Sequence, residues 1–179
     1  SIREIRFYDI HEGEDIAEEV YHKIMNDIIL PKAKFKAMEL LKSMDRTEFE
    51  LRSKLKNSGF SPLACEEAIA YVKKFNYIND YRYACNYVNL KRTSKSLRML
   101  QQELIRKGVE NSLIEQAMQE EYHEDMEEEA VRREVRKKCK DSHELSYEKK
   151  MKICASLYRK GYSFATVRKV MGDISIYDE

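Results

Sequence analysis

Side chains that could carry covalent, acid–base or metal chemistry are few in this chain and lie far apart in its sequence. They form no CxxC pair, no zinc-ligand spacing and no disulfide framework of the kind found in small secreted domains. The chain also lacks the P-loop, GxGxxG and GxSxG sequences of nucleotide sites and nucleophile elbows. The residues concerned are Cys65, Cys85, Cys139, Cys154, His11, His22, His123 and His143. We therefore predict a protein that is not an enzyme and that uses neither a metal nor a cofactor.

The chemistry that the sequence does offer is contact between charged surfaces. Charged residues make up 36% of the 179 residues, although the formal net charge is only +1. From Glu110 to Glu129 every Lys, Arg, Asp or Glu position is acidic, and basic residues prevail on both sides of that run. Separated patches of opposite sign favour a protein that works by binding a partner surface.

The best candidates for that contact are the Lys and Arg residues that precede the acidic run. Glu103 is the one carboxylate among them, so the sequence offers little local compensation of their charge. An ordinary solvated helix face is the competing interpretation, because charge runs are common on helices. The predicted contact residues are Lys91, Arg92, Lys95, Arg98, Arg106 and Lys107, with weaker analogues in Arg46, Arg52, Lys56, Arg159 and Lys160.

Two further sets of residues have a simpler interpretation beside a functional one. Glu128–Arg132 and Glu129–Arg133 have the i,i+4 spacing of intrahelical ion pairs, which accounts for part of the second basic block. Aromatic residues between positions 71 and 87 could stack on the bases of a single strand, but their helical spacing favours packing between helices. They are Tyr71, Phe75, Tyr77, Tyr81, Tyr83 and Tyr87.

The elements that must position these residues follow from an internal repeat. Gly59, Gly108 and Gly161 each have an aliphatic residue eight and four positions before them and an apolar residue directly after them. This pattern predicts a helix that ends in a left-handed glycine, with the next residue folding back onto the last turn. Thr47 and Glu50 have the spacing of a capping box, Ser61 precedes Pro62 as an N-cap, and Asp80 is a plausible N-cap.

Each glycine helix is preceded and followed by another helical segment, so each repeat is a unit of three helices. The predicted fold is all-α, with tandem three-helix repeats that stack into an elongated, curved array. The predicted domains are 1–31, an N-terminal extension, and the repeats 32–79, 80–124 and 125–179.

The extension is predicted to differ from the repeats. Alternating residues over 5–10 indicate a short strand, and Asp15 with Glu18 indicates the cap of a helix that ends before Pro31. Since a lone strand has no partner here, we expect the chain to be a fragment that lacks upstream strands.

No apolar run approaches the roughly 20 residues that a membrane-spanning helix requires, and no signal-peptide pattern opens the chain. We therefore expect a cytoplasmic monomer without membrane contact.

Three segments resemble the RecX family of bacterial recombination regulators. They are residues 46–60 (RTEFELRSKLKNSGF), 75–84 (FNYINDYRYA) and 100–109 (LQQELIRKGV). They are similar to that family's R-S/T-x-x-E-L-x-x-x-L…G-F, Y-L/I-D/N-D-x-R-Y-A and E-L-x-x-K-G-I/V segments. The resemblance runs from about Ala33 to the end and is weaker in the third repeat. The chain departs from the family at Thr93-Ser94-Lys95, where Gly-Lys or Gly-Pro is frequent.

The resemblance implies a regulatory protein that binds RecA and its filament on single-stranded DNA. It implies inhibition of recombinase, ATPase and co-protease activities, and hence a role in DNA repair, recombination and the SOS response. Weak direct DNA contact can accompany this role. The alternative is a tandem helix-turn-helix protein that binds duplex DNA, because the three-helix units are similar to that arrangement. Its binding would fall steeply with salt concentration.

Overall fold

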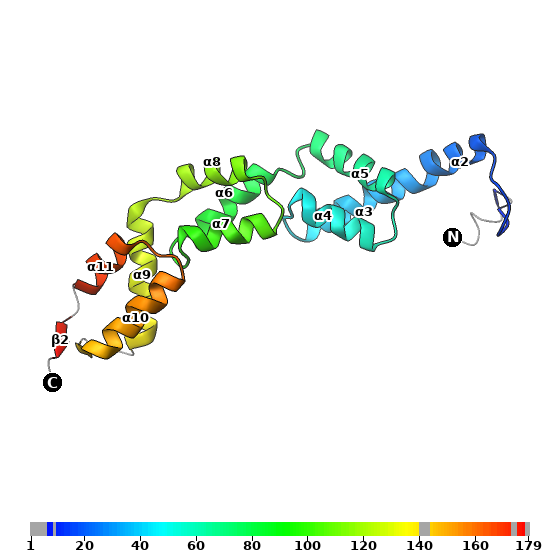
Figure 1. Ribbon diagram of the computed structural model, residues 1–179. Helices are drawn as coiled ribbons and strands as arrows, with labels where there is room; N and C mark the ends of the chain where they lie inside the picture. The colour runs from blue at the N-terminus through cyan, green and yellow to red at the C-terminus, as the bar shows by residue number, and fades with distance from the viewer. Residues whose placement is uncertain (1–6, 9, 140–143, 173–174, 178–179) are drawn as a thin grey trace. The chain divides into compact units, whose positions relative to one another are not determined.

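The structure is a computed structural model that describes residues 7–8, 10–139, 144–172 and 175–177. Most of these residues are helical, and the chain divides into two compact units, Ser1–Ile78 and Asn79–Glu179. The first unit contains α2 (Glu18–Ile24), the π-helical turn η1 (Met25–Ile29), α3 (Leu30–Ser43), α4 (Glu48–Asn57) and α5 (Pro62–Lys74) (Figure 1). The all-α prediction with tandem three-helix repeats is confirmed.

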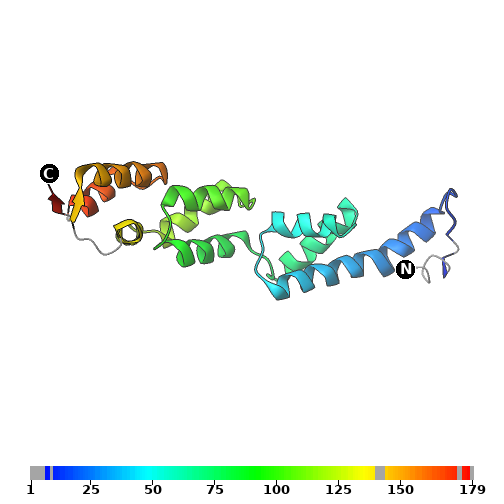
Figure 2. The ribbon, with the colours of Figure 1, turned by 90° about the horizontal axis from the view of Figure 1, so that it is seen from below.

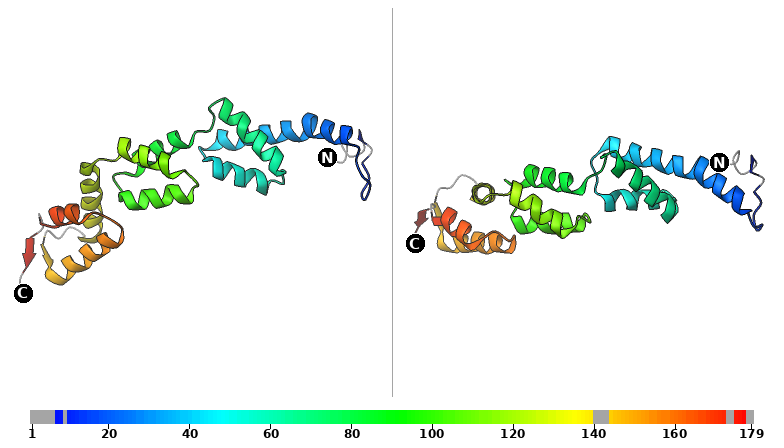
Figure 3. Two further views of the ribbon diagram at one scale, coloured as in Figure 1. Left: turned by 45° about the horizontal axis from the view of Figure 1, so that its top comes forward. Right: turned by 90° about the horizontal axis from the view of Figure 1, so that it is seen from above.

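The second unit contains two sets of three helices. The first set is α6 (Asp80–Lys91), α7 (Leu97–Arg106) and α8 (Asn111–Glu121), which pack together as Figure 2 shows. The second set is α9 (Glu124–Cys139), α10 (Tyr147–Arg159) and α11 (Phe164–Gly172), of which α9 packs against both others (Figure 3). Two short strands, β1 (Glu144–Ser146) and β2 (Ser175–Tyr177), pair in parallel beside them.

Each three-helix set has its own hydrophobic core, built from the residues that the repeat pattern predicts. Leu51 and Leu55 are fully buried in the first set, Leu100 and Leu104 in the second, and Ile153 and Leu157 are buried in the third. These positions, eight and four residues before each glycine, form one face of each glycine helix, since residues spaced by four lie one turn apart.

The predicted glycine turns are confirmed. Gly59, Gly108 and Gly161 have φ values of +87°, +78° and +82°, the left-handed conformation that an L side chain strains to adopt. In each turn the residue after the glycine donates its N–H to the carbonyl of the residue four positions before the glycine, as Phe60 does to Leu55 at 3.4 Å. This bond satisfies a carbonyl that the helix end would leave without a partner.

The second and third sets are joined by a hydroxyl and a glycine. Ser96 is fully buried, accepts the Met99 N–H as the N-cap of α7, and donates its hydroxyl to the Lys160 carbonyl at 2.6 Å. A Cβ placed on Gly161 would lie 2.9 Å from the Cβ of Arg98. The glycine at position 161 therefore serves both the turn conformation and the close approach of the two sets.

Helix caps agree with the sequence in part. Thr47 and Glu50 form the predicted capping box of α4, and Ser61 caps α5. At α6 the N-cap is Asn79, whose side chain accepts the Arg82 N–H, so the assignment of that cap to Asp80 is wrong by one residue.

The N-terminal prediction is wrong in two respects. Of residues 5–10, for which a strand is predicted, the structure describes three: Phe7 is helical, Tyr8 lies in a turn, and Ile10 has no regular structure. The rest of that segment lies outside the described residues. Among the described residues no strand pairs with this segment, and an isolated strand leaves its backbone groups without ladder hydrogen bonds.

The helix predicted to end before Pro31 instead continues to Ser43. Its N-cap is Ala17, with no side-chain cap, so Asp15 does not serve as the cap. A proline ring in a regular α-helix clashes with the carbonyl four residues earlier and removes a hydrogen bond. The π-helical turn η1 lies directly before Pro31 and widens the backbone there, so the helix continues past the proline. The predicted domain boundaries and curved stacking remain predictions.

Candidate partner-binding surface

The predicted basic residues of the second repeat lie around the turn between α6 and α7 and along α7. Lys91 ends α6, Arg92 and Lys95 lie in the turn, and Arg98 is in the first turn of α7. Arg106 ends α7, and Lys107 follows it at the C-cap. One helix hairpin therefore carries all six residues.

Two of the six side chains are paired with a glutamate, one from α8 and one from α7. Arg92 Nη1 donates to the Glu121 carbonyl oxygen at 3.0 Å and lies 3.5 Å from its carboxylate. Lys95 pairs with Glu103. The predicted lack of charge compensation is therefore wrong for Arg92 and Lys95, because the fold brings α7 and α8 carboxylates to the α6–α7 turn.

Glu103 is the centre of a polar network on this hairpin. Its carboxylate accepts from Lys95 and, at 2.7 Å, from the Tyr87 hydroxyl. Burial alone would raise the pKa of Glu103, but these hydrogen bonds and the nearby Lys95 and Arg106 charges outweigh it and lower the pKa. Burial and the hydrogen bond to Glu103 raise the pKa of Tyr87 to about 12. At neutral pH the pair is thus a carboxylate and a neutral phenol.

Lys107 lies over two aromatic rings of α6. Its Nζ is 5.4 Å from the Tyr83 ring centre and 5.6 Å from the Tyr87 ring centre, and the two rings are nearly parallel. Such cation–π contacts contribute about 0.5–1 kcal/mol at exposed sites. Lys107 is therefore part of the hairpin's packing.

The remaining three cations differ from these. In the part of the chain that the structure describes, Lys91, Arg98 and Arg106 make no ion pair. Arg98 is exposed although its aliphatic stem packs against Gly161, and Arg106 is exposed at the end of α7. Lys91, at the end of α6, is half-buried. We call these three residues the unpaired cations.

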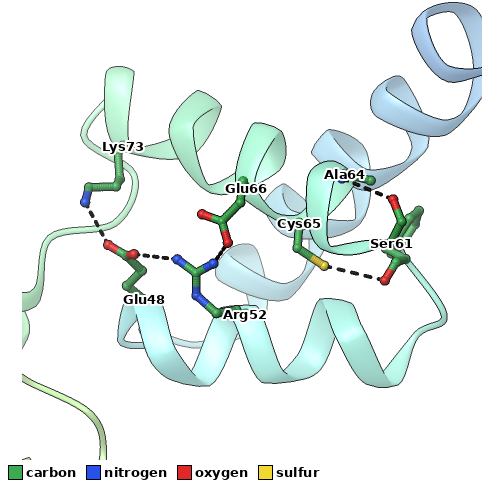
Figure 4. A network of polar contacts seen from close by, with 8 residues as sticks. Glu48, Arg52, Ser61, Ala64, Cys65, Glu66 and Lys73 are labelled. Carbon is green, nitrogen blue, oxygen red and sulfur yellow. Dashed lines mark hydrogen bonds and ion pairs between the residues drawn. The ribbon is translucent and has the colours of Figure 1, made fainter. Parts of the chain in front are cut away.

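The weaker candidates in the first repeat are mostly structural. Arg52 is held between Glu48 at 2.8 Å and Glu66, and Lys73 reaches Glu48 at 2.7 Å (Figure 4). Burial alone would raise the pKa of Glu48, but the hydrogen bonds from Lys73 and Arg52 outweigh burial, so the pKa is lowered. This network ties α4 to α5 and fixes the orientation of the arginine.

The other two candidates of the first repeat have different surroundings. Arg46 donates its Nε to the Leu40 carbonyl at 3.3 Å, which links the end of α3 to the segment before α4. Lys56 is exposed on α4. Only Lys56 of these three candidates offers a freely accessible charge.

The aromatic residues between 71 and 87 divide into two groups. Packing is confirmed for Tyr71 against the first core and for Tyr81, Tyr83 and Tyr87 against the second. It is wrong for Phe75 and Tyr77, which are 51% and 54% exposed and stack on one another at 6.1 Å. Asn76, which lies between them in the turn after α5, has a left-handed φ of +54°.

Two residues of the acidic run, Glu127 and Glu128, are used inside the third repeat. Glu128 pairs with Arg132, as the i,i+4 spacing predicts, and also with Lys169 of α11. Glu127 accepts the Ser163 N–H at 3.1 Å and the Thr166 hydroxyl at 2.8 Å, which ties α9 to the start of α11.

Sequence reasoning missed Glu134, the most buried carboxylate of the third repeat. It is 7% exposed and pairs with Lys137 at 2.9 Å and with Lys160. Burial alone would raise the pKa of Glu134, but the hydrogen bonds from these lysines lower it. Its position among apolar residues of α9 is the signal that could have identified it, since a carboxylate on a core face needs a cation.

The described residues contain no group of three His, Cys, Asp or Glu side chains that could hold a metal ion. Within the same residues, no helix has the length and apolar character needed to cross a bilayer.

Comparison with known protein families matches three consecutive segments of the chain. Models of the first, second and third three-helix domains of RecX match residues 33–71, 79–118 and 125–171. The matches follow the order of the domains and cover each of the three helix sets.

Several bacterial proteins described as regulatory protein RecX are similar in sequence. The one from Caldanaerobacter subterraneus subsp. tengcongensis is 35% identical over 90% of this chain and 80% of its own length. The one from Clostridioides difficile is 30% identical over 96% of this chain and 82% of its own length. The protein from Listeria innocua is 31% identical, and the chain spans 59% of its length.

Two crystal structures of RecX proteins have the same fold. One is 20% identical with a TM-score of 0.74 and covers 97% of this chain and 87% of its own. The other, from Lactobacillus salivarius, is 24% identical with a TM-score of 0.71 and covers 82% of this chain and 96% of its own.

Proposed function

The chain belongs to the RecX family of regulatory proteins, and from this premise we propose that it binds the RecA filament on single-stranded DNA and inhibits it. The inhibited activities are recombinase, ATPase and co-protease functions, so the protein regulates DNA repair, recombination and the SOS response in the cytoplasm. The observation that carries the proposal is the ordered match of three RecX domains to three consecutive helix sets.

We propose that contact is made first by the unpaired cations, Lys91, Arg98 and Arg106, and by Lys56 in the first repeat. Among the described residues these four make no ion pair, whereas Arg46, Arg52, Arg92, Lys95 and Lys107 hold helices together. A charge that is already paired adds little to a new interface, because the existing pair must first be broken. The paired residues then act as positioning residues for the unpaired ones.

Inhibition in this proposal requires no chemistry by the protein itself. Repeats that each bind weakly gain affinity when they engage neighbouring RecA subunits at once, because the second contact forms at high effective concentration. A protein bound across subunits opposes subunit addition or rearrangement, so inhibition follows the amount of bound protein rather than turnover.

The test is RecA strand exchange and single-stranded-DNA-dependent ATP hydrolysis at increasing amounts of the protein. The informative variant combines Lys91→Ala, Arg98→Ala and Arg106→Ala. The matched control combines Lys23→Ala, Lys42→Ala and Lys54→Ala, which remove the same charge from exposed positions of the first unit.

We expect the first variant to need at least about tenfold more protein for half inhibition, because three unpaired charges at an interface contribute about 1.4 kcal/mol or more together. The control should inhibit like the parent protein. A parent protein without effect on RecA refutes the function, and equal inhibition by both triple variants refutes the contact surface alone.

The alternative of direct DNA contact has one observation in its favour. Phe75 and Tyr77 form an exposed stacked pair next to Lys74, which is the arrangement on which single-stranded bases stack. Binding of a labelled oligonucleotide, measured against salt concentration for the parent protein and for Phe75→Ala, tests it. A DNA affinity that does not change in Phe75→Ala removes this pair from consideration.

A further inference from the structure

The hairpin of α10 and α11 is strongly basic. From Tyr147 to Gly172 the chain contains seven Lys or Arg residues and one acidic residue, Glu148, a net charge of +6. Two of the seven are paired with α9, Lys160 with Glu134 and Lys169 with Glu128. The other five are Lys149, Lys150, Lys152, Arg159 and Arg168.

These charges surround an exposed apolar stripe that runs along α10. Tyr147 and Met151 are 63% and 52% exposed, and Cys154 and Tyr158 continue the stripe as half-buried residues. The four positions follow i, i+4, i+7 and i+11, so they lie on one face of the helix. Phe164 of α11 extends the stripe, because its ring stacks on Tyr158 at 5.5 Å and is 66% exposed.

The stripe borders the face that holds α10 in the fold. Ile153 and Leu157 are buried in the core of the third repeat, with exposed fractions of 4% and 0%, and the half-buried Cys154 and Tyr158 pack against that core. The exposed part of the stripe is therefore formed by Tyr147, Met151 and Phe164. An exposed apolar surface of this kind, rimmed by charge, is typical of a surface that binds a protein partner.

Cations lie along both sides of the stripe. Lys152 and Arg159 come one position after Met151 and Tyr158, which places them beside it. On the other side, Arg168 lies near Tyr158 and Lys150 lies near Cys154. Burial raises the pKa of Tyr158 and of Cys154, and the charge of the nearby cation opposes the rise in each case. Among described residues, Lys149, Arg159 and Arg168 have no carboxylate at ion-pair distance.

We propose that this surface is a docking site for an acidic amphipathic helix of a partner protein. The apolar side chains of the partner helix pack along Tyr147, Met151 and Phe164, the exposed residues of the stripe. The acidic residues that flank its apolar stripe meet the cations on both sides, which fixes direction and register.

A protein helix fits this surface better than a single-stranded nucleic acid does. One face of the Phe164 ring is already covered by Tyr158, and Met151, at the middle of the stripe, has no π face for a base. Met is instead enriched at protein interfaces, where its flexible side chain adapts to a neighbour.

The test uses the full chain and a fluorescein-labelled synthetic helix of about 16 residues, long enough for four turns. The probe has Leu at i, i+4, i+7 and i+11 and Glu beside these positions, and the control peptide has Lys in place of Glu. Fluorescence anisotropy measures binding to the parent protein and to Met151→Glu, Phe164→Glu and Arg168→Glu. Leu63→Glu is the matched control, because Leu63 is 54% exposed in the first turn of α5.

We expect the acidic peptide to bind at least about tenfold more tightly than the basic one. Met151→Glu and Phe164→Glu should each weaken binding of the acidic peptide about tenfold, as loss of an interface anchor does, and Leu63→Glu should change it less than about twofold. Circular dichroism of each variant establishes that it is folded. The measurement contains no RecA, so its outcome does not depend on the proposed function.

Three outcomes would overturn the proposal. The first is equal binding of the two peptides, and the second is equal loss of binding in Met151→Glu and Leu63→Glu. The third is a different occupant. In that case Met151→Glu weakens binding of a labelled oligonucleotide, or weakens self-association measured by sedimentation, but leaves binding of the acidic peptide unchanged.

Discussion

Replacing Gly161 by alanine should destabilise the second unit more than the equivalent change at Gly59 destabilises the first. Both glycines have φ above +80°, where an alanine costs about 1–2 kcal/mol. The two positions differ in their neighbours. A Cβ at Gly59 has nothing within 4 Å, whereas a Cβ at Gly161 would be 2.9 Å from the Cβ and Cδ of Arg98.

The expected costs follow from that difference. Gly59→Ala should lower the free energy of unfolding by about 1–2 kcal/mol, the conformational cost alone. Gly161→Ala adds an overpacking cost of about 1–3 kcal/mol, since α7 must shift away from the turn. The total for Gly161→Ala is therefore about 2–5 kcal/mol. Shortening Arg98 to alanine removes the Cγ and Cδ contacts but keeps the Cβ contact, so it should recover only part of the added cost.

The assay is urea unfolding followed by circular dichroism, combined with amide hydrogen exchange that reports α4–α5 and α10–α11 separately. The exchange data are needed because two units need not unfold together. The double-mutant cycle of Gly161→Ala with Arg98→Ala isolates the contact from the backbone strain. Equal costs for Gly59→Ala and Gly161→Ala, within about 0.5 kcal/mol, would show that the Gly161–Arg98 approach does not constrain the fold.

Further predictions concern caps, a buried carboxylate and the exposed stripe. Ser96→Ala should cost about 1–2 kcal/mol, because it removes an N-cap and a buried hydrogen bond, while Ser146→Ala, which removes no cap, should change the free energy of unfolding by less than about 0.5 kcal/mol. The pKa of Glu134 is lower in the folded protein, so its contribution to stability is complete above the ordinary value of 4.5 and is lost as the pH falls through the folded value. The free energy of unfolding should therefore decrease less steeply with falling pH in Glu134→Gln than in the parent protein. The same decrease in both proteins would contradict the ion pairs of Glu134. Met151→Ala should change thermal stability little, whereas Ile153→Val should cost about 0.5–1.5 kcal/mol; a large loss in Met151→Ala would place that residue in the core.

Much of the fold could be predicted because it depends on local rules. The spacing of aliphatic residues before Gly59, Gly108 and Gly161 determines which face of each helix is buried, and the left-handed turn determines where each helix ends. The caps of Thr47 and Ser61 depend on residues three positions away at most. The resemblance to RecX rests on the same segments, since they are the ones that the fold constrains.

Other features depend on residues that are distant in the sequence, and the sequence could not rank them. A proline within a helical pattern usually ends the helix. Only the π-helical turn before Pro31 shows that this helix continues. The six predicted basic residues look alike in sequence. In the fold Glu121 of α8 pairs with Arg92, and Lys107 lies over the rings of Tyr83 and Tyr87. Among the described residues, Lys91, Arg98 and Arg106 are left without an ion pair.

The sequence alone determined the three repeats, their buried aliphatic residues and their glycine turns, because helix periodicity and glycine conformation act over fewer than about ten residues. Only the tertiary structure decided which charges are already paired and which apolar stripe of α10 faces the solvent. Ile153 and Met151 both lie on apolar stripes of that helix, and packing against α9 and α11 buries the first while the second remains exposed. Pairing and burial depend on neighbours brought together by the fold, so no pattern along the chain can assign them.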